Sequence, residues 1–334
     1  MAFNGRFVLS IIHFAGRQGV AMKDLFTAAG KNENELCQED CTLDHQKFNS
    51  VLEQAVFKSK NPFFGLHFGE SMNMTSAGLI AQITQTCETI KQGLEYACEF
   101  AQLACSSLPM TLTEEKKWYK LSMQPNATWA KDSSLAVKHT VDGTLVFTIN
   151  EFHQLTRNKH FPIKINLPFE QPTDRSDYES ALNCPIHFGQ NEIALFFKKE
   201  HLEEKVITSD YNLLRVLVAH AEEKISKINQ STGFFEQVKA SVANLIKPEF
   251  PTIEHVASHL NVSVRTLQRR LSEEQHTFKE IIESLRKEFA FSYLKNPALS
   301  INEIAYLLSY NDASGFIRSF KRWTGKTPNE FRNS

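Results

Sequence analysis

Two segments in the C-terminal part of this 334-residue chain share one pattern of apolar side chains. In residues 253–271, and again in residues 301–323, apolar residues recur at helical spacing, stop at a short polar turn and then resume. This spacing places the apolar side chains of each stretch on one face of a helix. Each segment therefore predicts two short helices that are joined by a tight turn and packed against each other. Two such helix-turn-helix units in series favour an all-helical C-terminal domain.

The second helix of the first unit has a buried face and an outer face with distinct chemistry. Ser263 is predicted to cap this helix, and Leu267 and Leu271 are predicted to be buried. Arg and Gln side chains lie on the outer face, where they can make paired hydrogen bonds to guanine and adenine edges in the DNA major groove. We therefore expect this helix to read bases, with four candidate residues: Arg265, Thr266, Gln268 and Arg269.

The second unit repeats the plan with a turn that is one residue longer. Asn311 or Asp312 is predicted to cap its second helix, which should bury Phe316, Phe320 and Trp323. The base-reading candidates on its outer face are Ser314 and Arg318. Contacts to phosphate add affinity but carry no sequence information. The candidates for that role in both units are Arg270, Lys321, Arg322, Lys326 and Thr327.

Residues 278–295, between the units, predict one continuous helix. At about 1.5 Å per residue it would span roughly 27 Å. Two recognition helices on such a strut can enter successive major grooves, which lie about 34 Å apart on one face of a duplex. One polypeptide would then read a double-stranded DNA site that most helix-turn-helix proteins read as dimers.

Charge, cysteine content and known catalytic motifs narrow the remaining classes of function. From Gly233 onward the chain has 14 Lys and Arg against 11 Asp and Glu, and before it 23 against 27. A mildly basic tail on an acidic body fits a DNA-binding module attached to another domain. All six cysteines precede that tail, which suggests reduced thiols in a cytoplasmic protein. No apolar run is long enough to span a membrane.

Sites for catalysis and for metal are not indicated. Cys37 and Cys41 lack the paired spacing of a zinc site. The sequence has no P-loop, nucleophile elbow, HExxH motif or dinucleotide-binding glycine pattern. We therefore expect a protein that is not an enzyme and has no cofactor or metal.

The first 230 residues predict an α+β domain. Residues 7–105 read as mainly helical, and residues 110–113 and 118–123 as a β-hairpin. Residues 137–156 fit either a helix or a strand. Strands are predicted at 161–167, 186–188 and 193–197, and helices at 178–182 and 209–229, the last with Leu213 and Leu214 in its buried apolar stripe. The polar segment 229–233 is the predicted boundary between a domain at 1–230 and a domain at 233–334.

The C-terminal motifs resemble those of the AraC/XylS family of bacterial transcription regulators. The resemblance rests on residues 263–271 (SVRTLQRRL), residues 277–278 (TF), residues 300–310 (SINEIAYLLSY) and residues 316–332 (FIRSFKRWTGKTPNEFR). It implies a double helix-turn-helix DNA-binding domain. Gln275 and Ser309 depart from the pattern, because glycine is common at both places. Each is expected to cost backbone strain if its φ is positive.

The N-terminal domain is similar to the arabinose-binding-type sensory domain of the subgroup that includes the ornithine utilisation regulator. The similar segments are residues 62–69 (PFFGLHFG), 77–79 (AGL) and 184–191 (CPIHFGQN). This resemblance implies a domain that senses a small effector and is a candidate for homodimerisation. It does not identify the effector or the residues that bind it.

Two hypotheses for function follow. In the first, the chain is a transcription regulator that binds double-stranded DNA, responds to a small metabolite and, as an activator, contacts RNA polymerase. In the alternative, it is a constitutive DNA-binding protein whose N-terminal domain serves dimerisation or protein docking. A ligand switches the protein only if it binds two states with different affinity.

Overall fold

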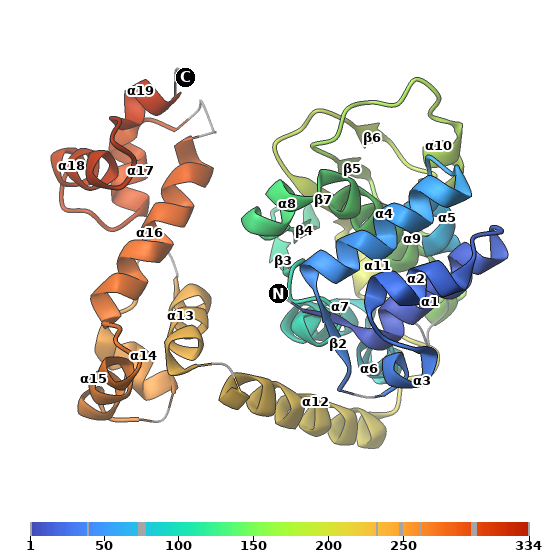
Figure 1. Ribbon diagram of the computed structural model, residues 1–334, viewed down its shortest axis with the longest axis horizontal. Coiled ribbons are helices and arrows are strands. Elements are labelled where there is room, and N and C mark those ends of the chain that lie inside the picture. The colour runs from blue at the N-terminus through green and yellow to red at the C-terminus, as the bar shows by residue number, and fades with distance from the viewer. Residues whose placement is uncertain are drawn as a thin grey trace. The chain divides into compact units, whose positions relative to one another are not determined.

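The chain folds into two compact units, Met1–Lys224 and Ile225–Ser334. The computed structural model (Figure 1) describes residues 2–38, 40–72, 78–231, 233–246, 250–260, 262–294 and 299–332. The division between the units falls within α12 (Tyr211–Ser231), a short distance before the polar segment at which the sequence suggests a boundary. The N-terminal unit combines helices with β-strands. Among the described residues of the second unit, the regular elements are all helices. This is the predicted fold class.

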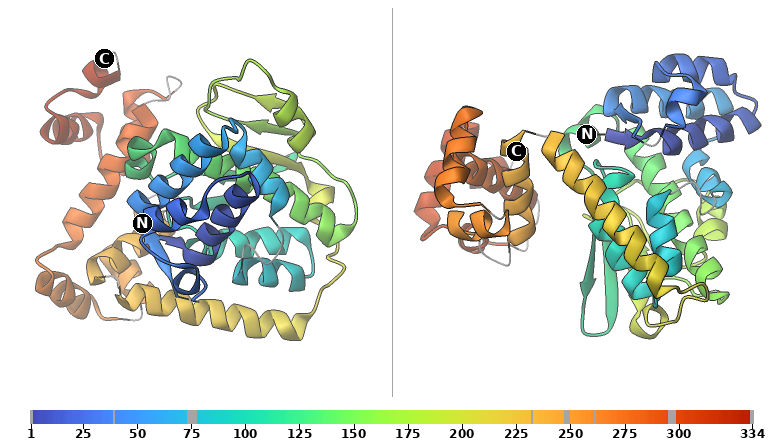
Figure 2. Two further views of the ribbon diagram at one scale, coloured as in Figure 1. Left: turned by 45° about the vertical axis from the view of Figure 1, so that its right-hand side comes forward. Right: turned by 90° about the horizontal axis from the view of Figure 1, so that it is seen from below.

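Most of the N-terminal unit is helical. Its helices α1, α2 and α4 pack together and are drawn in blue in Figure 2. The helices of this unit are α1 (Gly5–Arg17), α2 (Met22–Ala29), α3 (Glu33–Leu36), α4 (His45–Ser59), α5 (Phe64–Ser71), α6 (Leu79–Thr86), α7 (Ile90–Glu99), the 3-10 helix η2 (Ala101–Leu103), α8 (Ala127–Asp132), α9 (Ser134–Thr156), α10 (Ser176–Leu182), α11 (Lys199–Leu202) and α12.

Two small sheets complete this unit. The first pairs β1 (Ala2–Asn4) with β2 (Thr42–Asp44) in antiparallel orientation. The second has the strand order β3-β4-β7-β5-β6, in which only β5 and β6 run parallel. Its strands are β3 (Met110–Glu114), β4 (Trp118–Met123), β5 (Lys164–Asn166), β6 (Ile186–His187) and β7 (Ile193–Lys198). The predicted hairpin is confirmed, with Leu112 opposite Leu121.

Helix α9 lies at the centre of the unit and crosses α5 at very short range. A Cβ atom on Gly65 would lie 2.3 Å from the carbonyl oxygen of His139, and one on Gly69 would lie 2.6 Å from that of Gly143. Glycine is therefore required where the two backbones touch. Because α9 is covered on several sides, its buried residues do not form one stripe, which is why its sequence fits both a helix and a strand.

Three predictions on buried or extended residues were wrong in detail. The strand expected at 161–167 is reduced to β5, because Pro162 has no N–H to donate to a sheet. Leu213, expected in the buried stripe of α12, is 47% exposed, while Leu214 beside it is buried. Trp323 is half-buried rather than fully buried, and packs at the margin of its core.

The second unit contains the two helix-turn-helix pairs (Figure 1). Short polar side chains begin its helices: Ser263 accepts a hydrogen bond from the Thr266 N–H at 3.1 Å, and Asp312 accepts one from the Gly315 N–H at 2.7 Å. Both predicted caps are thus confirmed. The helices are α13 (Phe234–Leu245), α14 (Ile253–His259), α15 (Val264–Glu273), α16 (Phe278–Leu294), α17 (Ile301–Leu307), α18 (Ala313–Thr324) and α19 (Pro328–Arg332).

Helix α16 belongs to the cores of both pairs. Its first half contributes Ile281 and Leu285 to the core that holds α13, α14 and α15. Its second half contributes Ala290 and Leu294 to the core that holds α17 and α18. The single helix expected between the pairs is therefore present over its described length. Lys295, the last residue of the predicted span, lies outside the described residues.

Candidate nucleic-acid interface

The outer face of α15 is polar and basic. Leu267 and Leu271 are fully buried, and the side chains between them, at 268–270, are exposed. Arg265, Gln268 and Arg269 are exposed at positions i, i+3 and i+4, which places them on one face of the helix. A row of two guanidinium groups and one amide can meet base edges if this helix enters a major groove.

Two of the candidates on α15 have partners within the protein. Thr266 is half-buried rather than exposed, and its hydroxyl lies 2.8 Å from that of Ser263, so the expectation of an exposed side chain was wrong. Arg269 pairs with Glu273 one turn along at 2.6 Å. Both side chains of that pair are more than half exposed, so the pair is worth little and can open when a stronger acceptor arrives.

Arg270 is directed toward the neighbouring helix. Its guanidinium carbon lies 5.3 Å from the centre of the Phe234 ring on α13, a cation–π distance. The side chain is exposed, so its donors remain accessible beside that ring. A phosphate contact from Arg270 would therefore come from the edge of α15 near α13.

The outer face of α18 differs in its chemistry. Phe316 and Phe320 are fully buried, while Ser314, Arg318 and Lys321 are exposed at i, i+4 and i+7. Arg322, on the same side, donates to Glu283 of α16 at 2.9 Å. No local pattern in the sequence predicts this contact, because the partners are 39 positions apart. Arg322 thus links α18 to α16, and its side chain is still 61% exposed.

The last two phosphate candidates lie where α18 ends and α19 begins. Lys326 is exposed, one residue after Gly325, which has a left-handed backbone. Thr327 is half-buried, and its hydroxyl accepts a hydrogen bond from the Glu330 N–H at 3.3 Å. The Thr327 side chain also hydrogen-bonds to the Glu330 carboxylate, so a phosphate oxygen would have to replace that carboxylate as its acceptor.

Glutamate side chains secure helix starts in both helix-turn-helix pairs. Hydrogen bonds from the backbone N–H of Phe235 and of Phe234 hold the pKa of Glu274 below its usual value. The Ser300 N–H does the same for the pKa of Glu303, and the Thr327 N–H for that of Glu330. These carboxylates stay ionised near neutral pH and keep the helix starts fixed.

The two positions that depart from glycine have the expected strained backbone. Gln275 has φ of 60° and Ser309 has φ of 54°, both in the left-handed region. Gln275 lies just after α15, the second helix of the first pair, and Ser309 lies just after α17, the first helix of the second pair. In each case the next residue bonds back into the helix. The His276 N–H donates to the Leu271 carbonyl and the Tyr310 N–H donates to the Ala305 carbonyl, both at 2.9 Å. This turn usually ends in glycine.

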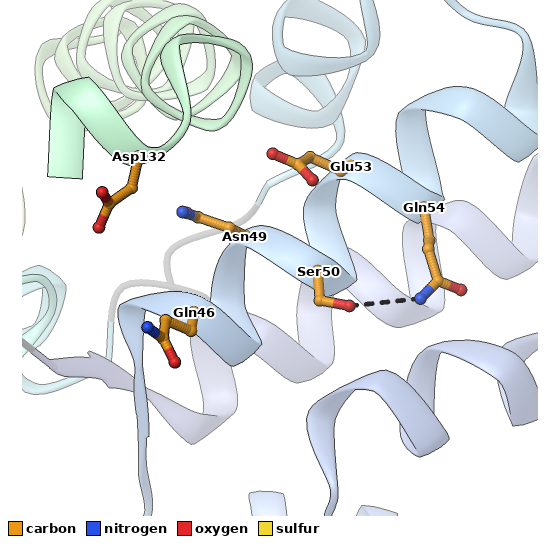
Figure 3. A pocket seen from close by; sticks show the side chains of 6 residues that line it. All are labelled: Gln46, Asn49, Ser50, Glu53, Gln54 and Asp132. Atoms are coloured by element: carbon orange, nitrogen blue, oxygen red, sulfur yellow. Dashed lines mark hydrogen bonds between the residues drawn. The ribbon is translucent and has the colours of Figure 1, made fainter.

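The N-terminal unit has a polar hollow of about 350 Å³ at α4 and the end of α8, lined by Gln46, Asn49, Ser50, Glu53, Gln54 and Asp132. Asn49 is only 7% exposed, and its carbonyl oxygen accepts from the Trp129 indole at 2.8 Å. Figure 3 shows the amide nitrogen of Asn49 and the carboxylate of Glu53 directed to the side on which Asp132 lies. Glu53 accepts a hydrogen bond from the Ser133 hydroxyl at 2.5 Å and Asp132 lies 2.9 Å from the His45 imidazole, so a bound cation would share both carboxylates with these partners.

Within the described residues, no group of three or more metal-ligating side chains comes together, and all six cysteines are unpaired. Burial raises the pKa of Cys98, Cys105 and Cys184 to about 12, so these thiols are unreactive. In the same part of the chain, no helix combines the length and the apolar character needed to cross a bilayer.

Comparison with known protein families decides the class. Residues 256–334 match a helix-turn-helix domain family. Residues 19–206 match the family described as the arabinose-binding domain of AraC transcription regulators, N-terminal. The chain belongs to the AraC family of transcription regulators. It is a DNA-binding transcription regulator, and the exposed faces of α15 and α18 belong to the domain that carries that activity.

Two named regulators are similar to this chain over much of their length. The chain is 22% identical to the ornithine utilization regulator of Pseudomonas aeruginosa over 332 residues, which is 97% of this chain and 94% of the relative. It is 23% identical to the regulator VirS of Mycobacterium tuberculosis, covering 88% of this chain and 86% of VirS. These relatives are named as transcription regulators, a function that is not enzymatic.

Two further matches either cover a smaller part of the chain or have a lower sequence identity. The virulence regulon transcriptional activator VirF of Shigella flexneri is 29% identical over 125 residues, 36% of this chain and 47% of VirF. The crystal structure of the transcriptional regulator CdpR from Pseudomonas aeruginosa is 20% identical, covers 96% of this chain and 98% of CdpR, and has a TM-score of 0.46.

Proposed function

We propose that this AraC-type regulator reads promoter DNA with both helix-turn-helix pairs and that a small metabolite bound to its N-terminal unit controls that reading. The observation that carries the proposal is the duplicated scaffold with two exposed recognition faces on one shared helix, α16. The 17 residues of α16 span roughly 25 Å, which suits two contacts about one turn of DNA apart.

In this proposal α15 supplies most of the base recognition. Arg265 and Arg269 can each bind guanine O6 and N7, and Gln268 can bind adenine N6 and N7. Ser314 and Arg318 on α18 add fewer base contacts. Arg270, Lys321, Arg322, Lys326 and Thr327 are assigned to phosphate, where they fix register and add affinity that depends on salt.

The test of base recognition uses DNA selected from a random pool by the full chain. Arg265→Ala and Gln268→Ala should each relax preference at one base position by about 1–3 kcal/mol. Lys287→Ala, an exposed cation on α16, is the matched control and should leave base preference unchanged. If neither α15 variant changed any base preference, the assignment of α15 as the reader would fail.

The effector part of the proposal is supported by the N-terminal family match and by the polar hollow at α4. The hollow presents the carboxylates of Glu53 and Asp132 beside amide groups. We propose that it binds a small metabolite with an ammonium group. Binding regulates DNA contact only if the hollow has different affinities in two states of the protein.

A thermal-shift screen of the full chain against amines, amino acids and other metabolites tests this part. A stabilising amine whose effect is lost in Glu53→Gln but kept in Glu70→Gln, an exposed carboxylate on α5, would support the hollow as its site. A stabiliser insensitive to Glu53→Gln would place sensing elsewhere. No stabilisation by any compound would favour the alternative function, a constitutive DNA binder with a docking domain.

Partners and location complete the proposal. VirF is named an activator, and we propose that this regulator also activates transcription in the cytoplasm by contacting RNA polymerase at its promoter. Two exposed apolar residues three positions apart on one face of α12, Leu213 at 47% and Val216 at 64%, favour a homodimer. Transcription reconstituted with purified polymerase tests the first point. Sedimentation of the full chain and of Val216→Glu tests the second, since the charge should shift a dimer toward monomer.

A further inference from the structure

The two helix-turn-helix pairs meet in a packed group of side chains around the middle of α16. We call Phe250, Arg286, Phe289, Ser309 and Tyr310 the junction cluster. Phe250 and Phe289 each pack against the cores of both pairs, and their rings lie 6.2 Å apart at an angle of 76°. The pairs are therefore joined by side-chain contacts as well as by the continuous helix.

Arg286 holds the centre of the junction cluster. It lies on α16 and donates a hydrogen bond to the Ser309 carbonyl at 2.8 Å. Its guanidinium carbon is 4.6 Å from the centre of the Tyr310 ring and 5.4 Å from that of Phe250. Phe250 precedes the first pair, and Tyr310 lies in the turn of the second. One cation thus contacts both pairs from the helix between them.

Ser309 adds a second link across the same junction. Its hydroxyl accepts a hydrogen bond from the Phe250 N–H at 3.1 Å, between residues 59 positions apart. Glycine, which is usual at such a turn, could not make this bond. A non-glycine residue in the left-handed region costs roughly 1–2 kcal/mol. Gln275, which follows the second helix of the first pair, has the same left-handed backbone but an exposed side chain.

We propose that Ser309 and Arg286 form a brace that fixes the orientation of the second helix-turn-helix pair relative to the first, and so restricts the DNA spacing that the protein accepts. The proposal rests on the proposed function, in which both pairs contact one duplex. Both residues are positioning residues. Inserting one base pair moves a groove by about 3.4 Å and rotates it by roughly 35°, which a braced reader cannot follow.

The first experiment measures the brace in the protein without DNA. Spin labels are attached to Ser272→Cys on α15 and Asn329→Cys on α19, both exposed positions, in a full chain carrying Cys37→Ser to remove the exposed native thiol. Ser309→Gly should broaden the distribution of distances between the labels, and Ser309→Ala should do so as well. Gln275→Gly, the matched backbone control, should leave it unchanged. If the distribution of label distances were the same in all three variants, the proposed brace would be overturned.

The second experiment measures the consequence for DNA. Duplexes selected by the full chain are remade with one base pair inserted between the two segments that footprinting shows to be protected. We expect Ser309→Gly to bind the original duplex within about twofold of wild type, and its loss of affinity on insertion to be at least about tenfold smaller than that of wild type. Gln275→Gly should lose affinity as wild type does.

The outcomes separate the brace from the proposed function. A broadened label distribution with an unchanged insertion penalty would overturn the restriction on spacing. A wild-type footprint that covers only one segment would overturn two-pair reading, while the label distances would still decide whether the brace exists. Because Ser309→Gly relieves backbone strain, this variant should remain folded, and its thermal unfolding is measured alongside.

Discussion

In the first helix-turn-helix pair the outer face of the second helix presents Arg265, Gln268 and Arg269, whereas the corresponding face of the second pair presents Ser314, Arg318 and Lys321. The inner faces are alike, because each helix packs two large apolar side chains into its own core and begins at a short polar cap. The two pairs share one scaffold, while their outer faces differ. This difference underlies our proposal that the first pair contributes more to base selection and the second more to affinity.

The cores provide the largest expected effects. Phe320→Ala should remove about 3–5 kcal/mol of stability from the second pair, because the buried ring leaves a cavity. Leu267→Ala should cost the first pair about 2–5 kcal/mol for the same reason. Hydrogen exchange of the full chain would show the loss of protection centred on the altered pair. If either substitution loosened both pairs equally, the pairs would not have separate cores.

DNA binding should distinguish the outer faces next. Arg269→Ala is expected to cost about 1–3 kcal/mol at one base position and to leave other positions unchanged. Lys321→Ala should weaken binding to all sequences alike and lower the slope of log affinity against log salt by about one. Quantitative binding to a panel of single-base variants at several salt concentrations measures both. The contrast between the pairs breaks down if Lys321→Ala alters base preference while Arg269→Ala does not.

Acid should weaken the helix starts. The pKa of Glu303 is held below its usual value of 4.5 by the Ser300 N–H, and hydrogen bonds likewise lower the pKa of Glu274 and Glu330. A carboxylate with a lowered folded pKa contributes stability above its unfolded pKa, and this contribution is lost as pH falls. Unfolding midpoints should therefore fall as pH drops below about 4.5. Glu303→Gln should flatten this dependence, and Glu70→Gln, at an exposed carboxylate on α5, is the control.

The smallest expected effect comes from the strained residue that follows α15. Gln275→Gly removes an unfavourable left-handed φ at an exposed side chain and should raise stability by at most about 1–2 kcal/mol. Ser309→Gly relieves similar strain but loses the bond to Phe250, so its gain should be smaller. Chemical denaturation of both variants tests the ranking. A larger gain at Ser309 would mean that its hydroxyl bond contributes nothing to stability.

The two helix-turn-helix pairs and α16 could be predicted because their helices are amphipathic and begin at recognisable caps such as Ser263 and Asp312, whereas α13 and α19 were not predicted. The strain at Gln275 and Ser309 was also predictable, since their motif positions usually require glycine. The contacts that cross between elements were not, because nothing local signals that Arg322 meets Glu283 or that Ser309 meets Phe250. In the N-terminal unit, the central helix α9 was ambiguous because it is buried on several sides.

The sharing of α16 between two cores also bears on how the regulator is made. Ribosomes add roughly 5–20 residues per second, and N-terminal portions fold first. The core around Leu267 is complete once α16 has emerged, whereas the other core needs Phe331 of α19, whose ring lies 5.6 Å from that of Phe320. The first pair can therefore close while the second is still being synthesised, and its half of α16 then offers a preformed template on which the last helices assemble.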